Sequence, residues 1–299
     1  MNISYDLKPG RLILDLPADA EDISLAEFLR SYHISGKKKY ELLQKHQITI
    51  NRNDASGNEI LHGKDRITFA LPSQEIDYQP GEIECEIVYE DDFVYVARKE
   101  PGIIVHDPDD PECLASKAAA YQRNHGIQSP VRYIHRLDRE TTGLVLFVKI
   151  PLLQAWYDAK LEEKEIEREY LAITGGKGHA GQRFTYNQNI GRDRHVSGKY
   201  RFSSTGKEAI TKAVVLDRKH DLLLMRCRLL TGRTHQIRVH LSGNRHPIIN
   251  DPLYGIPSSQ FEHMCLWADT IRFSDPFTGE QRTVQDTFNE DFAKFSAKS

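Results

Sequence analysis

The sequence HRLDRETTGL, residues 135–144, sets one aspartate between two arginines immediately before an apolar run. That run, Leu144 to Val148, predicts a buried strand. An aspartate at the entrance to such a strand, with a guanidinium on either side, indicates a chemical rather than a structural role. A second stretch, TGRTHQIRVHL at residues 231–241, is basic and lies far along the chain, so it offers Asp138 a cationic partner.

The length and the cysteines limit the class of protein. A chain of 299 residues exceeds what one compact core comfortably fills, so two domains are expected. Residues 1–10 do not resemble a signal peptide and no apolar run reaches membrane-spanning length, which predicts a soluble, cytoplasmic protein without a membrane partner. No CxxC pair occurs and the histidines between 235 and 246 lack acidic or cysteine neighbours, so neither a metal site nor a disulfide framework is expected. The cysteines, expected to be reduced and partly buried, are Cys85, Cys113, Cys227 and Cys265.

Charge is segregated along the chain, although the formal net charge is only -3. Residues 30–45, 192–207 and 226–245 are rich in lysine and arginine, whereas residues 75–92 are acidic and contain neither. Basic patches on an otherwise acidic protein suit a polyanion bound in a defined orientation, because the acidic surface repels phosphate elsewhere. Solvated faces with chance clustering are the alternative for any single patch.

Residues 1–75 are expected to form a small α/β domain. Two short helices with a basic surface, followed by a small hairpin with a Gly63-Lys64-Asp65 turn, resemble the ribosomal protein S-four type of RNA-binding domain. The resemblance implies RNA contacts through Lys37, Lys38 and Lys39, and a small packing domain without a ligand is the alternative. The expected elements are a strand at 11–16, a helix begun by the capping box of Ser24 and Glu27, a basic helix that includes Lys37 to Leu43, a strand at 48–50, a turn at 53–57 and a strand at 67–71.

The rest of the chain is expected to form the catalytic domain, residues 82–299. A polar stretch with two prolines, 72–81, separates the two, and residues 76–81 are the predicted linker. Strands outnumber helices and several follow each other directly, which favours an α+β fold with a mixed, largely antiparallel sheet over a doubly wound one. The expected strands are 87–89, 93–97, 142–148, 170–174, 213–216 and 222–229, and the expected helices are 115–121 and 152–163.

Ordered motifs in this second domain resemble those of the RluA-type pseudouridine synthases. Besides the two stretches quoted above, they are EPGIIVH at 100–106, REYLA at 168–172, DPLYG at 251–255 and IRFSDP at 271–276. The resemblance covers residues 82–292. The chain departs from the family at Glu100-Pro101, where Lys-Pro is usual, and at Leu266-Trp267-Ala268, where Leu-His-Ala is usual. Neither departure falls on a residue that family members use for chemistry.

The resemblance implies conversion of a uridine within RNA to pseudouridine, without a cofactor. The bond at nitrogen 1 breaks, the uracil rotates, and carbon 5 is joined to the same ribose. An ionised carboxylate must attack the ribose or the ring, or assist departure of the base, and Asp138 is the matching residue. Because an apolar pocket raises the pKa of a lone carboxyl group, a fixed cation must keep it charged. The arginine of the family's QIR motif, here Arg238, has that role and cannot lose its proton at working pH.

Further roles implied by the resemblance concern the base and the RNA backbone. A proton must leave carbon 5, and a flipped base needs a flat surface. Tyr170 matches the family tyrosine credited with both, and direct base, water-mediated and stacking roles stay open. Arg136 is the expected wedge that fills the gap left by the extruded nucleotide. Arg233 and His235 are expected to position phosphate or backbone, and His135 to support the loop.

The predicted function is therefore that of an RNA pseudouridine synthase, acting as a monomer on ribosomal RNA, with transfer RNA as the alternative substrate. An RNA chaperone or ribosome-assembly factor that keeps the fold without catalysis is a competing hypothesis, and a hydrolase that releases free uracil is another. Without the resemblance, Asp138 and Arg238 would form a structural ion pair and Tyr170 would be core. Neither the target RNA nor the modified position follows from the sequence.

Overall fold

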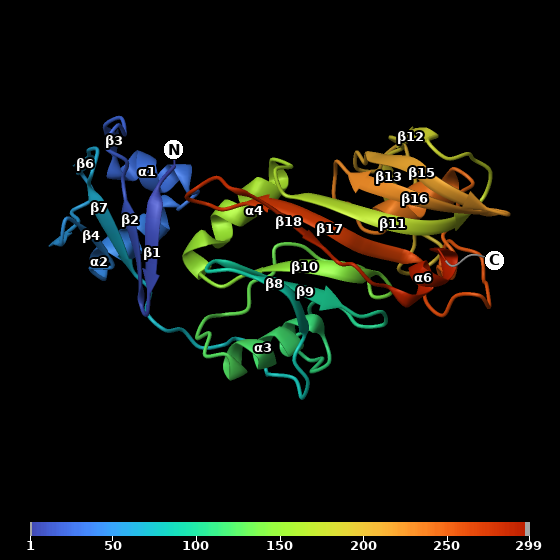
Figure 1. Ribbon diagram of the computed structural model, residues 1–299, viewed down its shortest axis with the longest axis horizontal. Coiled ribbons are helices and arrows are strands. Elements are labelled where there is room, and N and C mark those ends of the chain that lie inside the picture. Colours follow the sequence, from blue (N-terminus) through green and yellow to red (C-terminus); the bar gives the residue numbers. More distant parts are fainter. Residues whose placement is uncertain (1, 297–299) are drawn as a thin grey trace.

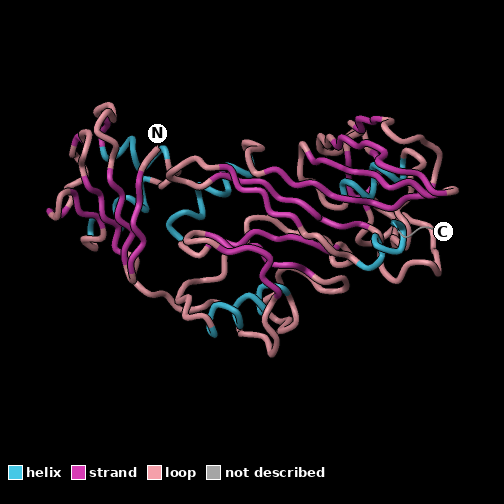
Figure 2. Tube along the Cα trace, in the orientation of Figure 1, coloured by secondary structure: helices cyan, strands magenta, loops and turns pink. Residues whose placement is uncertain are grey.

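The computed structural model describes residues 2–296, which form a small N-terminal part and a larger part built on one long sheet. The two labelled chain ends lie at opposite sides of the molecule (Figure 1). Strands run through most of the larger part (Figure 2). None of the helices in the described range is both long and apolar enough to cross a membrane.

The N-terminal part is an antiparallel sheet, in the order β1-β2-β7-β4-β5, with two helices. The capping box at Ser24 and Glu27 forms as expected and begins α1, while Ser35 accepts a hydrogen bond from the Lys38 amide and begins α2. The elements are β1 (Ser4–Lys8), β2 (Arg11–Asp15), β3 (Ile23–Ser24), α1 (Leu25–Ser31), α2 (Gly36–Gln44), β4 (Ile48–Ile50), β5 (Asn53–Asp54), β6 (Ile60–Leu61) and β7 (Arg66–Ala70).

The turn expected at residues 53–57 is wrong in its position. Asn53 and Asp54 pair with β4 as strand β5, and the chain reverses at Asn51 and Arg52, which both have positive φ. The Asn51 side chain donates to Asp65 at 2.7 Å and accepts from the Arg66 amide at 3.0 Å. These two bonds fix the chain reversal two residues before the start of the expected turn.

The larger part contains a nine-stranded sheet, in the order β12-β15-β16-β11-β17-β10-β9-β8, with β18 paired to β17. Every strand pair in this sheet is antiparallel except β10 with β17, so the expected α+β fold with a mixed, largely antiparallel sheet is confirmed. The elements are β8 (Glu86–Glu90), β9 (Val94–Lys99), α3 (Leu114–Asn124), β10 (Thr142–Val148), η1 (Pro151–Leu153), α4 (Gln154–Glu162), β11 (Glu167–Gly175), β12 (Arg183–Tyr186), β13 (Ile190–Arg192), β14 (Tyr200–Phe202), β15 (Thr211–Lys219), β16 (Leu222–Leu229), α5 (Gln236–Gly243), β17 (Leu266–Ser274), β18 (Gln281–Gln285) and α6 (Glu290–Ser296).

The single parallel contact joins the two halves of the long sheet. Thr142 pairs with Trp267 and Gly143 with Ala268. Gly143 has a φ of +114°, and a Cβ at this position would lie 2.3 Å from the carbonyl oxygen of Ala268. Only glycine allows this conformation and this approach. Gly143, the final residue of the HRLDRETTG motif, therefore lets β10 enter the middle of the sheet. Asp138 lies on the loop just before β10.

Two apolar cores lie on opposite faces of the sheet. On β10, Val145 and Phe147 belong to the core that α3 covers, and Leu144 and Leu146 belong to the core that continues into the N-terminal part. The turn between β17 and β18 makes that connection, because Phe277 contacts the rings of Tyr5, Tyr32 and Phe93 at centroid distances of 5.8, 5.3 and 5.3 Å. The four cysteines are buried and free of disulfides, in agreement with the sequence analysis.

The stretch predicted as a linker, residues 76–81, has no regular structure and runs between the two parts. It is nevertheless attached to the larger part. Asp77 accepts a hydrogen bond from the Val131 amide at 2.8 Å, and the Gly81 amide donates to the carbonyl of Ser116 at 2.9 Å. These contacts restrict how far the stretch moves as a flexible tether.

Helix α5 forms where the sequence predicted no element. Ile237, Val239 and Leu241 alternate with polar residues, a period that is typical of a strand rather than a helix. All residues from 236 to 241 are buried, so the helix has no solvent-facing side to impose a helical period on the sequence. The N-cap His235 has φ +55° and ψ 20°, which turns the preceding loop sharply into the helix.

Candidate active site

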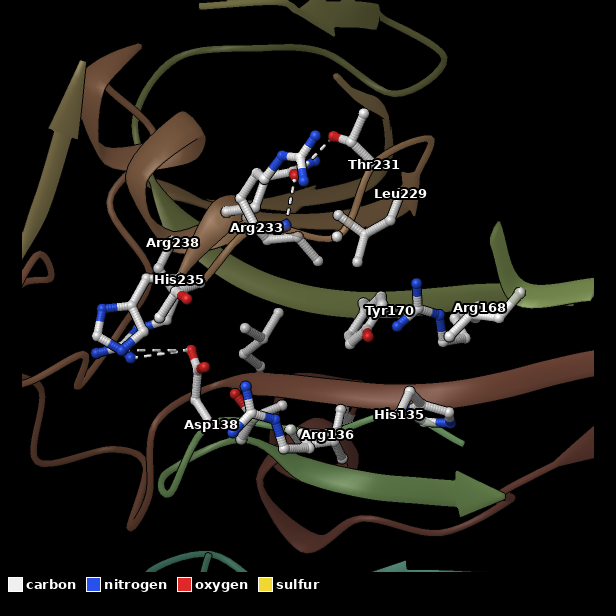
Figure 3. Close-up of a pocket in the computed structure, with 18 of the residues that line it drawn as sticks. His135, Arg136, Asp138, Arg168, Tyr170, Leu229, Thr231, Arg233, His235 and Arg238 are labelled. Carbon is white, nitrogen blue, oxygen red and sulfur yellow. Dashed lines mark hydrogen bonds and ion pairs between the residues drawn. The ribbon is translucent and has the colours of Figure 1, made fainter. Parts of the chain in front are cut away.

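A cavity of about 830 Å³ lies where the loop before β10 meets α5 and the loop that precedes it. Both stretches singled out in the sequence line it. Asp138 faces His235 and Arg238 at one end, and Tyr170 and Arg168, both on β11, lie toward the other end (Figure 3). A volume in the range of roughly 300–1,000 Å³ is typical of sites that enclose a small ligand, so a single nucleotide fits here.

Asp138 and Arg238 form the ion pair that the sequence predicted, although 100 residues separate them. Arg238 Nη1 donates to Asp138 Oδ2 at 3.0 Å. The Arg238 side chain is 4% exposed and that of Asp138 is 25% exposed, although both residues line the cavity. Of the two partners, the carboxylate is therefore the more open to an incoming ligand.

Arg238 also binds a second carboxylate, that of Asp251. No role was predicted for Asp251 from the sequence. Arg238 Nε and Nη2 each donate to Asp251 at 2.8 Å in a bidentate pair. Burial by itself lowers the pKa of Arg238, but the hydrogen bonds and charges of Asp251 and then Asp138 outweigh it and raise that pKa. The position of Asp251 in DPLYG, which follows QIR closely, is the signal that could have indicated it.

Asp251 is in turn fixed by the backbone. Its side chain is fully buried, and its Oδ1 also accepts the amides of Leu253 and Tyr254 at 2.9 and 3.1 Å. A buried carboxylate with this many donors does not rotate freely. Arg238 is therefore held in one orientation, and its remaining Nη1 points at Asp138.

His235 lies beside Asp138, a position that sequence alone could not assign. Its Nε2 is 3.9 Å from Asp138 Oδ2, and its Nδ1 is 2.9 Å from the hydroxyl of Tyr254. Burial lowers the pKa of His235, and the nearby Asp138 carboxylate only partly opposes this effect. A neutral imidazole therefore adjoins the carboxylate at neutral pH.

Tyr170 and Arg168 form the wall opposite Asp138. Tyr170 is 4% exposed and lines the cavity, and burial raises the pKa of its hydroxyl. Arg168 makes no ion pair within residues 2–296, and its buried Nε has no hydrogen-bond partner there. An arginine without a counter-charge in a cavity wall is available to an anionic ligand.

The two other arginines expected at the site also reach the cavity. Arg136 is exposed and extends into the space between Asp138 and Tyr170 in Figure 3. Arg233 is exposed as well, but its Nε donates to the carbonyl of Glu208 at 2.8 Å, which ties it to the neighbouring loop. Arg136 is the less constrained of the two.

The loop that carries Asp138 is held in place by contacts with buried side chains. His135 is buried, and its Nε2 accepts the Leu146 amide at 3.4 Å, which agrees with the expected supporting role. Lys99, missed by the sequence analysis, is fully buried and donates to the carbonyls of Glu100, Ile103 and Arg139 at 2.7, 2.8 and 2.8 Å. These three bonds join the end of β9 to the loop that carries Asp138.

The three lysines proposed for RNA binding are not part of this cavity. Lys37, Lys38 and Lys39 lie on α2, in the N-terminal part, and none of them lines the cavity. Lys37 and Lys38 are exposed, whereas Lys39 is partly covered and donates to the carbonyl of Gly57 at 2.9 Å. Any contact they make with RNA is remote from the site of chemistry.

The family model described as RNA pseudouridylate synthase matches residues 93–243, a span that includes Asp138, Tyr170 and Arg238. The chain belongs to the RNA pseudouridylate synthase family. A relative from Bacillus subtilis, described as the uncharacterized RNA pseudouridine synthase YhcT, is 35% identical over 250 residues, which cover 82% of this chain and 82% of the relative. The ribosomal large subunit pseudouridine synthase D of Vibrio vulnificus is 30% identical over 276 residues, which cover 87% of this chain and 84% of the relative.

Two solved human structures have the same fold. RNA Pseudouridylate Synthase Domain Containing 4 aligns with a TM-score of 0.58 and 22% identity, covering 70% of this chain and 90% of its own. RNA Pseudouridylate Synthase Domain Containing 1 aligns with a TM-score of 0.56 and 24% identity, covering 70% of this chain and 86% of its own. The predicted family, the enzyme class of isomerase and an RNA substrate are thereby confirmed. The roles of individual residues and the S-four-like nature of the N-terminal part stay predictions.

Proposed function

We propose that this pseudouridine synthase isomerises a uridine of ribosomal RNA, with Asp138 as the nucleophile and the target nucleotide flipped into the cavity. Relatives that are named as ribosomal large subunit synthases support ribosomal RNA as the substrate. A test that offers both RNAs would show modification of transfer RNA instead if that is the substrate. The reaction is proposed for a monomer in the cytoplasm.

One observation carries the assignment of Asp138. Its carboxylate is open to the cavity while the arginine that pairs with it is buried and clamped by Asp251. The clamp keeps a negative charge available without supplying a proton, since Arg238 stays charged and does not give up its proton at working pH. Attack on the ribose and attack on the uracil ring both begin from this same carboxylate.

The place of the carboxylate within the cavity wall supports the proposal of base flipping. Asp138 lies between Arg238 and Arg136 in an enclosure suited to one nucleotide, so a base stacked in a helix does not reach it. Arg136 is exposed and long enough to stack in the gap that an extruded nucleotide leaves. Arg168 and Arg233 are proposed to bind the flanking phosphates.

Tyr170 is proposed to stack on the flipped uracil and to direct a water toward carbon 5. Because burial raises the pKa of Tyr170, its phenol stays protonated at neutral pH and is a poor direct base. Its hydroxyl has no protein partner in the described range, which leaves it free to hold a water. The proton at carbon 5 then leaves to solvent through that water.

The assignment of Asp138 is tested with Asp138→Asn. We expect loss of tritium release from carbon 5 of labelled uridine in RNA, while RNA binding changes by no more than about twofold, because the shape is kept and only the charge is lost. Asp109→Asn, at an exposed position outside the cavity, is the matched control. Pseudouridine formation by Asp138→Asn at the wild-type rate would remove Asp138 as the nucleophile, and free uracil from the wild type would indicate a hydrolase.

The role of Tyr170 is tested with two substitutions. Tyr170→Phe keeps the ring, so we expect kcat to fall at least about 10-fold, with KM within about twofold, because one hydrogen bond made in the reaction is lost. Tyr170→Leu removes the flat surface as well, so KM should also rise. Equal effects of both variants on KM would contradict the separation of stacking from water binding.

A further inference from the structure

Two hydrogen bonds and one longer contact run from strand β14 to the carboxylate of Asp138. The backbone amide of Tyr200 donates to the hydroxyl oxygen of Tyr254 at 2.7 Å. That hydroxyl is 2.9 Å from His235 Nδ1, and His235 Nε2 is 3.9 Å from Asp138 Oδ2. Tyr200 and Tyr254 also hold the imidazole edge-on, with ring centroids at 5.5 and 5.7 Å.

The direction of these bonds determines where the imidazole proton lies. A backbone amide only donates, so the oxygen of Tyr254 is the acceptor from Tyr200. The one proton of the Tyr254 hydroxyl is then available to His235 Nδ1, and the bond with Nδ1 as acceptor uses that proton while the oxygen accepts from Tyr200. A neutral imidazole that accepts at Nδ1 has its proton on Nε2. In the described range, that proton faces Asp138.

We propose that His235 is a positioning residue whose Nε2–H, in a tautomer selected by Tyr254 and strand β14, orients Asp138 so that its Oδ1 attacks the substrate. The proposal rests on Asp138 being the nucleophile. Asp138 Oδ2 accepts a hydrogen bond from Arg238 Nη1 at 3.0 Å and faces His235. Asp138 Oδ1, in contrast, has no hydrogen-bond partner among residues 2–296. The two oxygens are therefore inequivalent, and Oδ1 is the one left available to a substrate in the cavity that Asp138 lines.

The separation of 3.9 Å is too long for a hydrogen bond and short enough for a small side-chain rotation to close it. Substrate entry is the event proposed to close it, because a nucleotide in the cavity excludes the water that otherwise solvates Asp138. Strand β14 belongs to the hairpin with β13, which carries Arg192, Lys199 and Arg201. RNA bound by this basic hairpin would thus act on the same series of contacts.

The tautomer is tested by nitrogen NMR of the histidine-labelled enzyme without RNA, at neutral pH. We expect His235 to be neutral with its proton on Nε2, and we expect Tyr254→Phe to add a substantial Nδ1-protonated population. Tyr254→Phe keeps the ring over which Arg238 stacks at 5.1 Å, so the pairing of Arg238 with Asp138 persists. A wild-type proton on Nδ1, or a charged imidazole, overturns the proposal whether or not Asp138 is the nucleophile.

Kinetics with two substitutions of His235 separate positioning from packing. Asparagine tolerates the φ of +55° better than most residues but does not reach Asp138, so His235→Asn should lower kcat roughly 10- to 100-fold, the worth of one hydrogen bond to a charged group. Glutamine places an amide N–H near the position of Nε2, so His235→Gln should recover part of the loss despite its strained backbone. A normal kcat in His235→Asn, or no recovery in a folded His235→Gln, contradicts the proposal.

Discussion

At the scale of single residues, His240 shows how hydrogen bonding and burial settle a protonation state. It is fully buried, and its Nε2 donates to the carbonyl of Gln188 at 2.9 Å. Thr211 accepts from Gln236 Nε2 at 3.0 Å, so its hydroxyl proton is free for His240 Nδ1 at 2.9 Å. Burial lowers the pKa of His240, and the bond to Gln188 only partly opposes that change.

This pKa shift predicts how stability depends on pH. Below the ordinary value of 6.5, the unfolded chain binds a proton at His240 that the folded protein excludes, so the free energy of unfolding falls as pH decreases below 6.5 and is unaffected above it. His240→Gln keeps a donor for Gln188 but cannot bind that proton, so it should make the decline between about pH 7.5 and about pH 5.5 less steep. Urea unfolding at both pH values measures this, with exposed His195→Gln as the control. An unchanged slope in His240→Gln would contradict the assignment.

At the scale of elements, the parallel pairing of β10 with β17 determines where the catalytic loop starts. The pairing is only two residues long, and Gly143 is one of them. The loop before it is pinned by Lys99 and by the amide of Gly102, which donates to the Arg139 carbonyl at 3.0 Å. A change in this short pairing displaces Asp138, because few residues separate Asp138 from the paired residues of β10.

Gly143→Ala is expected to destabilise the protein by about 3 kcal/mol or more, since both the backbone strain and the clash with the Ala268 carbonyl must be relieved. Gly126→Ala is the matched control. It has a φ of +71° with no atom within 4 Å of the added Cβ, so only the strain of about 1–2 kcal/mol applies. Denaturant midpoints of the two variants give the comparison. Equal losses would show that the approach to Ala268 is unimportant.

At the scale of the whole molecule, the N-terminal part is attached to the larger part through the turn between β17 and β18. Phe277 packs in the core that the two parts share, and the Ile3 amide donates to the Phe277 carbonyl at 3.0 Å. Helix α2 lies in the part of the molecule beyond this attachment (Figure 1). Its lysines are therefore suited to the affinity for RNA rather than to the chemical step.

Lys37→Gln combined with Lys38→Gln is expected to weaken RNA binding about 10-fold and to reduce the slope of log affinity against log salt by about 2, because each lysine neutralises one phosphate. The value of kcat at saturating RNA should stay unchanged. Filter binding at several salt concentrations measures the slope, and Lys8→Gln, an exposed lysine on β1, is the control. A lower kcat with unchanged affinity would place these lysines in another role.

Local patterns in the chain determined much of the local structure and the family. The capping box at Ser24, the apolar strand after Asp138 and the burial of the cysteines all follow from contacts between near neighbours or from side-chain polarity. The motifs around Asp138, Tyr170 and Arg238 also identified the family, because their order along the chain needs no tertiary structure to be recognised.

Only the tertiary structure decided how those residues act together. The second partner of Arg238, Asp251, depends on the backbone turn at Leu253 and Tyr254, and the tautomer of His235 depends on an amide of β14. Helix α5 was hidden for the same reason, since a fully enclosed element loses the polar face that marks its period. Contacts between residues distant in sequence are set by packing of the whole sheet, and no local pattern of residues encodes them.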